Sequence, residues 1–107
     1  MSFTVVVRQG TGGERVYQTL DEVRKNAPKL MAMKTRGSNE AHKYIDVYIG
    51  AFSYTKKPAY RIQFGGFMST DPNDLIMEKF SNGRWNTIGW IQDKRWYSKA
   101  NGKSKKL

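Results

Sequence analysis

The pair Asn82-Gly83 constrains the fold of this 107-residue chain more than any other feature, because it separates two runs that have the composition of β-strands. Both central residues of a two-residue type I′ turn need a positive φ, which asparagine and glycine adopt readily. The sequence therefore predicts a hairpin made of residues 74–81 and 84–92.

A two-residue loop also determines the register of the hairpin, and side chains alternate between the two faces of a strand. Uninterrupted pairing from the turn places Leu75 opposite Trp90 on an apolar face, which we expect to belong to the core. Phe80 and Trp85 pair on the other face, beside Arg84. We interpret that mixed aromatic and basic face either as a binding surface or as a cross-strand pair that only supports the turn.

Four further segments have the alternation or the β-branched content of strands. They are residues 3–8, 14–18, 44–50 and 59–67. With the hairpin they make about six short antiparallel strands. Gly65-Gly66, inside the last of these segments, predicts a bulge, a bend, or a close approach of another part of the chain.

One helix is expected between the second and third strands. Thr19 and Glu22 have the spacing of a capping box, and apolar residues from Val23 to Leu30 recur at helical spacing. Pro28 lies inside this pattern and predicts a kink or a division of the helix just before it. The predicted fold class is α+β: a curved antiparallel sheet or small open barrel of about six strands, with this helix packed on one face.

Residues 1–100 are expected to form a single α+β domain, because 107 residues are enough for one modest core. Residues 101–107 contain three lysines and little apolar surface, so we expect a basic, mobile C-terminal tail. The sequence contains no cysteine, no signal-peptide pattern and no apolar span of transmembrane length. These observations favour an intracellular, cytoplasmic protein without a membrane partner.

The charge of the chain points to an acidic partner. Nineteen Lys and Arg against nine Asp and Glu give a net charge of +10, and 13% of the residues are aromatic. Nucleic acid is the commonest partner of so basic a chain, and aromatic rings interleaved with basic side chains favour single strands. The candidate nucleic-acid-binding residues are Tyr44, Tyr48, Lys56, Lys57, Arg61, Phe80, Arg84, Trp85, Lys94, Arg95, Lys99, Lys103, Lys105 and Lys106.

An alternative hypothesis is a non-catalytic inhibitor or accessory protein, of the kind that phages and mobile elements encode. Its basic surface would dock on an acidic surface of a host nucleic-acid-processing protein, or on a ribonucleoprotein. Trp96 and Tyr97 either cap a sheet edge or contact a ligand in both hypotheses.

Catalysis is not expected from this sequence. No pair of carboxylates has the spacing for acid–base chemistry, and no serine lies in a nucleophile motif. His42 is the single histidine, and without cysteine or an acidic cluster it cannot build a metal site. We therefore expect neither metal nor cofactor, and the remaining catalytic alternative is a metal-independent nuclease that uses His42.

Overall fold

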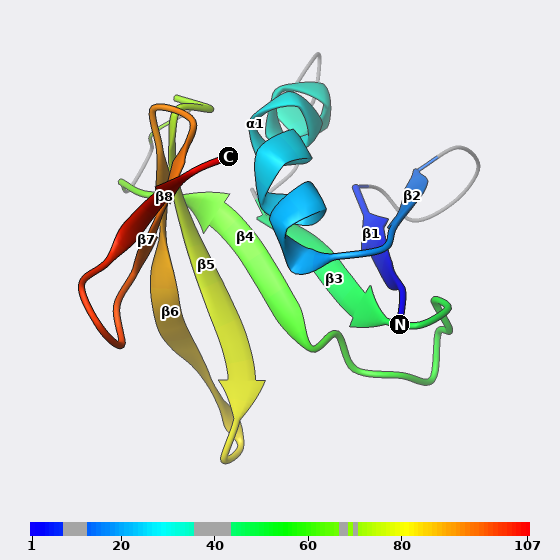
Figure 1. Ribbon diagram of the computed structural model, residues 1–107. Coiled ribbons are helices and arrows are strands. Elements are labelled where there is room, and N and C mark those ends of the chain that lie inside the picture. The colour runs from blue at the N-terminus through cyan, green and yellow to red at the C-terminus, as the bar shows by residue number, and fades with distance from the viewer. Residues whose placement is uncertain (8–12, 36–43, 67–68, 70) are drawn as a thin grey trace.

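A computed structural model of the chain describes residues 1–7, 13–35, 44–66, 69 and 71–107. Within them, one helix and eight strands follow one another along the chain (Figure 1). The helix is α1 (Leu20–Thr35), and the strands are β1 (Phe3–Val6), β2 (Glu14–Tyr17), β3 (Tyr44–Ile49), β4 (Tyr60–Phe64), β5 (Asp74–Ser81), β6 (Arg84–Gln92), β7 (Arg95–Ser98) and β8 (Ser104–Lys106).

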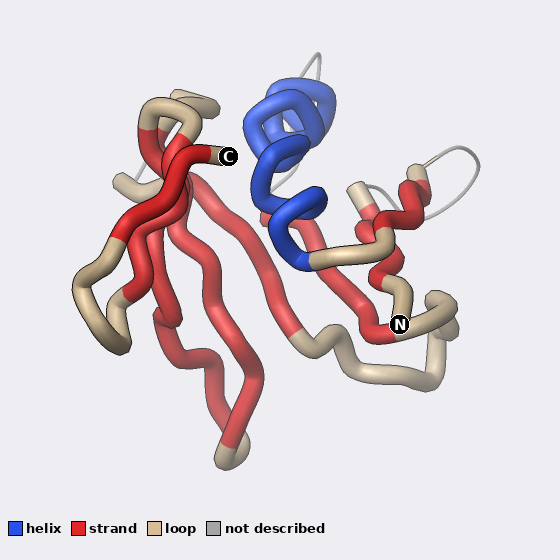
Figure 2. Tube along the Cα trace, viewed as in Figure 1, coloured by secondary structure: helices blue, strands red, loops and turns tan. Residues whose placement is uncertain are grey.

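All eight strands belong to one sheet, in the order β2-β1-β3-β4-β5-β6-β7-β8, and each pair of neighbours is antiparallel. The sheet curves around α1, so that its two ends lie on either side of the helix (Figures 1 and 2). We call the face that carries α1 the inner face and the opposite face the outer face. The predicted α+β class with one helix on an antiparallel sheet is confirmed, but the number of about six strands was wrong.

The two strands that the sequence analysis did not predict are β7 and β8. Asp93 and Lys94 have positive φ values of 49° and 65°, so they make a two-residue turn between β6 and β7 without an Asn-Gly pair. β8 then pairs with β7, and Leu107 packs against the core. Residues 104–106, which we expected in a mobile tail, are instead an edge strand of the sheet.

The core lies between α1 and the inner face. Val23, Ala27, Leu30 and Met31 are the buried side chains of the helix, which confirms the predicted apolar helix face. They pack against the aliphatic side chains of the central strands, so α1 and the sheet share one core. The strand residues of this core include Val5, Ile45, Val47, Ile62, Leu75, Met77, Ile91 and Trp96.

The helix begins at the predicted capping box. The amide of Glu22 donates to Oγ1 of Thr19 at 3.1 Å, which satisfies one of the free amides at the helix start. Pro28 does not divide the helix, which continues through it to Thr35. Buried apolar side chains before and after Pro28 hold both halves on the sheet, and this packing outweighs the lost hydrogen bond. No helix among the described residues is long and apolar enough to cross a membrane.

Gly65, at the end of β4, allows a close approach of β5. Its amide donates to the carbonyl oxygen of Asp74 at 2.8 Å, and an added Cβ would lie 2.6 Å from Oδ1 of Asp74. Gly65 therefore lies in close contact with Asp74, and a close approach of another part of the chain was one of the predicted alternatives.

Candidate functional site

The register of β5 and β6 decides which side chains reach the outer face. From the turn as far as the pair Glu78–Thr87 the residues face each other as predicted. The next pair is Met77–Gly89, so Ile88 is an extra residue without a partner opposite it. This is a β-bulge, and it shifts the remainder of β6 by one position.

The bulge turns Trp90 to the outer face. Trp90 lies opposite Ile76, while Ile91 occupies the buried position opposite Leu75. The prediction that Trp90 pairs with Leu75 in the core was wrong, because it assumed an uninterrupted ladder and a shift of one residue exchanges the two faces. Tyr97 of β7 lies opposite Trp90. The two aromatic side chains are therefore neighbours on the outer face.

Trp96 takes the inner position next to this bulge. Its ring is buried in the core, and the guanidinium of Arg24 on α1 lies 3.9 Å from the ring centre. A Cβ at Gly89 would overlap both the indole of Trp96 and the carbonyl oxygen of Tyr97. Of the two residues whose role the sequence left open, Trp96 is thus a core residue and Tyr97 lies on the outer face.

The centre of the outer face carries a group of side chains around Arg61 of β4. Nε of Arg61 donates to Oε1 of Glu78 at 2.8 Å, and the Gln63 amide donates to the same oxygen. The guanidinium lies 4.5 Å from the ring centre of Trp85 and 5.3 Å from that of Tyr44. Glu78 is only 8% exposed, so its carboxylate neutralises Arg61 at short range.

Phe80 and Lys57 extend this group toward the hairpin tip. The rings of Phe80 and Trp85 meet edge to face at 5.3 Å, and Nζ of Lys57 lies 4.3 Å from the ring centre of Phe80. We call the whole set the Arg61 cluster; its members are Tyr44, Lys57, Arg61, Gln63, Glu78, Phe80 and Trp85. Its rings and charges contact one another, as in a cross-strand pair that supports the turn.

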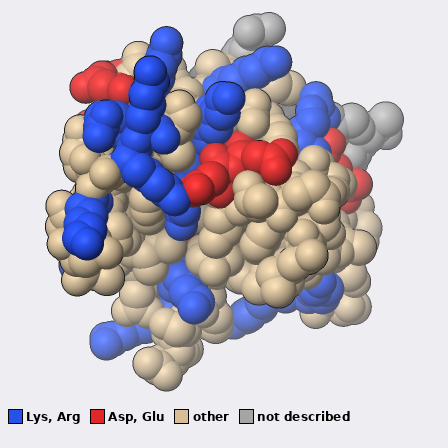
Figure 3. Space-filling model, in the orientation of Figure 1, with Lys and Arg blue, Asp and Glu red and all other residues tan. Residues whose placement is uncertain are grey.

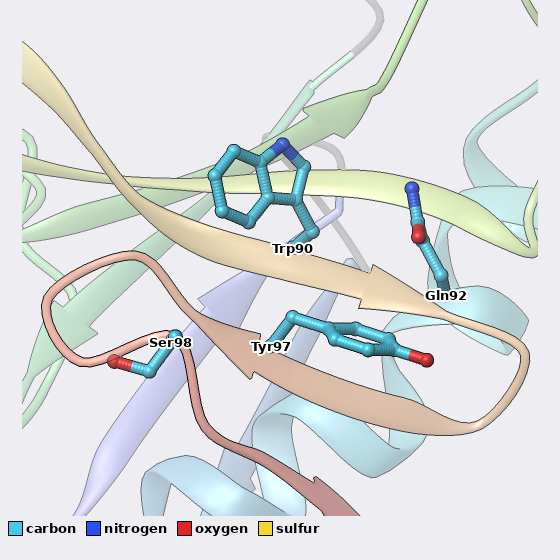
Figure 4. A pocket seen from close by; sticks show the side chains of 5 residues that line it. Trp90, Gln92, Tyr97 and Ser98 are labelled. Atoms are coloured by element: carbon cyan, nitrogen blue, oxygen red, sulfur yellow. The ribbon is translucent and has the colours of Figure 1, made fainter.

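A second group surrounds an open pocket of about 360 Å³ at the β6–β7 end of the outer face (Figure 4). We call it the Trp90 pocket; it is lined by Trp90, Gln92, Tyr97, Ser98 and Gly102. Figure 4 shows the side chains of Trp90 and Tyr97 on neighbouring strands. Among the described residues, neither ring has an aromatic or cationic partner. Nε2 of Gln92 donates to Oδ1 of Asp74 at 3.0 Å.

Basic residues adjoin the lining residues of the Trp90 pocket in the sheet or in the sequence. Arg95 lies opposite Gln92, and Lys106 lies opposite Arg95. Lys99 and Lys103 are exposed, and each follows a lining residue in the sequence. Figure 3 shows Lys and Arg side chains gathered over β7 and β8. Of the predicted binding residues, these four are therefore the ones that the fold brings together around open aromatic rings.

Two of the predicted lysines have structural contacts elsewhere. Nζ of Lys105 lies 2.7 Å from Oδ2 of Asp21 at the start of α1, on the inner side of β8. Nζ of Lys56 donates to the carbonyl oxygens of Ile49 and Ala51, at 2.7 and 3.0 Å. These contacts direct the two ammonium groups away from the Arg61 cluster and from the Trp90 pocket.

The other predicted residues do not line the Trp90 pocket. Tyr48 is buried, with its ring 5.0 Å from that of Phe52, and this burial raises the pKa of its hydroxyl. Its ring is therefore covered, contrary to our expectation of a stacking surface. Arg84 and Lys94 are exposed at the two turns that precede and follow β6.

The carboxylates of the described residues do not form a metal-binding cluster. No group of three or more His, Cys, Asp or Glu side chains among them could hold a metal ion. Glu78 is engaged by Arg61 and Gln63, and His42 lies outside the described residues.

Comparison of the chain with protein-family models, with curated proteins and with solved structures found no match.

Proposed function

We propose that the protein binds single-stranded nucleic acid on the outer face of β6, β7 and β8. The observation that supports this proposal is the Trp90 pocket. Its two partly exposed rings have no aromatic or cationic partner among the described residues, and four basic residues adjoin its lining residues in the sequence or in the sheet. Aromatic rings stack on unpaired bases, and Lys and Arg neutralise the phosphates between those bases.

The distribution of partners among the basic residues supports this location. Arg61 is paired with Glu78, and Lys105 is paired with Asp21, so both charges are already balanced. Arg95, Lys99, Lys103 and Lys106 make no ion pair within the described part of the chain. Among the described residues, the side chain of Arg95 donates only to the hydroxyl of Ser104, at 3.3 Å. These four residues would supply the phosphate contacts. The Arg61 cluster would stabilise the sheet on which the nucleic acid lies.

The experiment is a fluorescence titration with a short single-stranded oligonucleotide at several salt concentrations. Each phosphate contact contributes about 0.7 to the slope of log affinity against log salt for single strands. Lys106→Gln should therefore lower the slope by about 0.7. Lys105→Gln is the matched control, because Lys105 is the next residue on β8 but faces Asp21, and its slope should equal that of the wild type.

Two outcomes would contradict the proposal. Absence of binding at low salt would exclude nucleic acid as the partner. Equal effects of Lys105→Gln and Lys106→Gln would mean that the outer face is not the contact surface, and that only the total charge matters.

Exposed apolar side chains at the other end of the sheet favour a second candidate, the inhibitor or accessory protein that binds a host protein or a ribonucleoprotein. Val16 is 61% exposed and Tyr54 is 77% exposed, and Met1 and Ile49 are exposed as well. The ring of Tyr54 contacts that of Phe52 at 5.0 Å. Such side chains could supply the apolar contacts that a protein partner needs.

The second candidate is tested by retention of a stoichiometric protein partner after nuclease treatment. Tyr54→Ser should weaken that retention, and Lys106→Gln should weaken it less if the apolar end makes the contact. Loss of every retained protein on nuclease treatment would contradict a direct protein partner.

A further inference from the structure

We infer that the Trp90 pocket holds one unpaired nucleobase, stacked against Trp90 and Tyr97. An amino group of the base donates to the side-chain carbonyl oxygen of Gln92. This inference rests on the proposed function and specifies the contact that makes binding depend on the bases. The Trp90 pocket would then be the one site on the outer face that contacts a base.

The pocket has free aromatic surface, whereas the Arg61 cluster does not. Trp85 and Phe80 contact each other, and Arg61 and Lys57 lie against their rings. Stacking a base there would require the displacement of these contacts. Trp90 and Tyr97 have no such partners among the described residues, so a base can stack on them without any rearrangement.

The size and position of the pocket suit a base that belongs to a nucleic-acid strand. Its volume of about 360 Å³ lies near the lower end of the range for small-molecule sites. It is open on the outer face, so the sugar and phosphate of the bound nucleotide would remain in solvent. Lys99 and Lys103 flank it in the sequence, and Arg95 and Lys106 lie on the adjoining strands.

Gln92 gives the pocket a polar group with a defined orientation. Its amide nitrogen is held by Asp74 at 3.0 Å, and its carbonyl oxygen has no hydrogen-bond partner among the described residues. A carbonyl oxygen accepts hydrogen bonds and cannot donate them. Cytosine presents an amino group at the position where thymine presents an oxygen, so the pocket should prefer cytosine to thymine.

The first experiment compares an intact oligonucleotide with an abasic strand of the same length and phosphate number, by anisotropy of an end-attached dye. Wild-type protein should bind the intact strand more tightly. Trp90→Leu should lower the affinity for the intact strand by about 5- to 150-fold, the equivalent of one lost stacking contact. It should leave the affinity for the abasic strand unchanged, which also shows that the variant is folded.

Trp85→Leu is the matched control, because Trp85 lies on the same strand and face but its ring is already engaged by Arg61 and Phe80. It should change the affinity for the intact strand less than twofold. Salt-dependent but equal binding of intact and abasic strands by the wild type would exclude a base in the pocket. Of the proposed function it would leave only the binding of phosphates by the basic residues. Absence of binding to either strand would overturn both.

A second experiment tests Gln92 by the ratio of affinities for oligo-dC and oligo-dT. The wild type should favour oligo-dC several-fold, and Gln92→Leu should bring the ratio to about one. A ratio that is the same in the wild type and in Gln92→Leu would overturn the role of Gln92. Because the ratio compares two ligands of one protein, partial loss of folded protein does not alter it.

Discussion

Glu78 is a buried carboxylate on the outer face, where it accepts hydrogen bonds from Arg61 and Gln63. Arg61 is itself only partly exposed, with 24% of its side-chain surface accessible. Removal of the carboxylate would leave the guanidinium and the amide without their acceptor in a place that water reaches poorly. The loss of folding free energy in such a change comes mainly from the hydrogen-bond donors that remain without an acceptor.

Glu78→Ala should therefore lower the free energy of unfolding by about 1–3 kcal/mol. Glu78→Gln should cost less, because it retains an acceptor oxygen. Urea unfolding followed by tryptophan fluorescence measures both values. Glu14→Ala, at an exposed position on β2, is the control and should change stability by less than about 0.5 kcal/mol. An unchanged midpoint for Glu78→Ala would show that the Arg61 cluster is not coupled to stability.

Asp21 makes a contact of a different kind, because it is half-exposed. The hydrogen bond from Lys105 lowers its pKa below the usual 3.8, partial burial opposes this, and Arg24 adds to the lowering. A lowered pKa means that the charged carboxylate stabilises the folded state above about pH 4, and that this contribution is lost as pH falls through the folded value. Solvent screening limits the contribution to at most about 1 kcal/mol.

The stability difference between wild type and Asp21→Asn should accordingly be present at pH 6 and low salt, and should disappear at about pH 2. Urea unfolding at the two pH values measures it. High salt at pH 6 should also reduce the difference, since exposed charges are screened. A difference that stayed constant with pH would mean that the Asp21–Lys105 contact does not depend on the charge of Asp21.

At the scale of the element, β6 is the strand on which the outer face depends. Its bulge at Ile88 lets Ile88 and Gly89 both lie toward the inner side and returns Trp90 to the outer face. The bulge lies next to Gly89, against which the indole of Trp96 packs. Glycine is required there for space, because a Cβ would overlap the neighbouring ring and a carbonyl oxygen.

Gly89→Ala should lower the free energy of unfolding by about 1–3 kcal/mol, the usual scale of overpacking. Thermal or urea unfolding measures the change. Gly66→Ala is the control, since a Cβ there would lie 3.5 Å from Cβ of Ser69, an ordinary contact distance. Equal stability of the two variants would contradict the close packing of β6 on Trp96.

At the scale of the whole molecule, the C-terminal strand joins the far end of the sheet to the helix. β8 pairs with β7, Lys105 reaches Asp21 at the start of α1, and Leu107 packs against the core. Figure 1 shows the C-terminus beside α1. The last residues therefore contribute to folding as well as to the positive charge of the outer face.

A chain that ends at Asn101 should be less stable than the full chain by about 1–3 kcal/mol, the scale of a few ladder hydrogen bonds and one apolar side chain. The double variant Lys103→Gln/Lys106→Gln removes two charges but keeps β8, and should be within about 0.5 kcal/mol of the wild type. Thermal unfolding distinguishes them. If the truncated chain were equally stable, the C-terminal residues would behave as the tail that the sequence suggested.

Local signals account for the parts of the fold that could be predicted. The Asn82-Gly83 turn, the Thr19–Glu22 cap and the alternation of β4 each arise within a few residues, and each is confirmed. The alternation of β3 is confirmed only from Tyr44 to Val47, because Tyr48 is buried and Ile49 is exposed. β7 was missed because Asp93 and Lys94 adopt positive φ without glycine. The candidate site was predicted only in part, because Tyr48 is covered and Lys105 faces the helix.

The residues of the chain are thus enough to predict the fold class, the register of the hairpin next to its turn and the basic, aromatic character of the protein. Which aromatic rings remain open depends instead on packing between strands. That choice depends on the bulge at Ile88, and the bulge lies where Trp96, from another strand, packs against Gly89. The alternation of apolar and polar residues along β6 does not reveal such a contact. The extra residue at Ile88 reverses the two faces of the strand, and its position depends on a residue of the neighbouring strand.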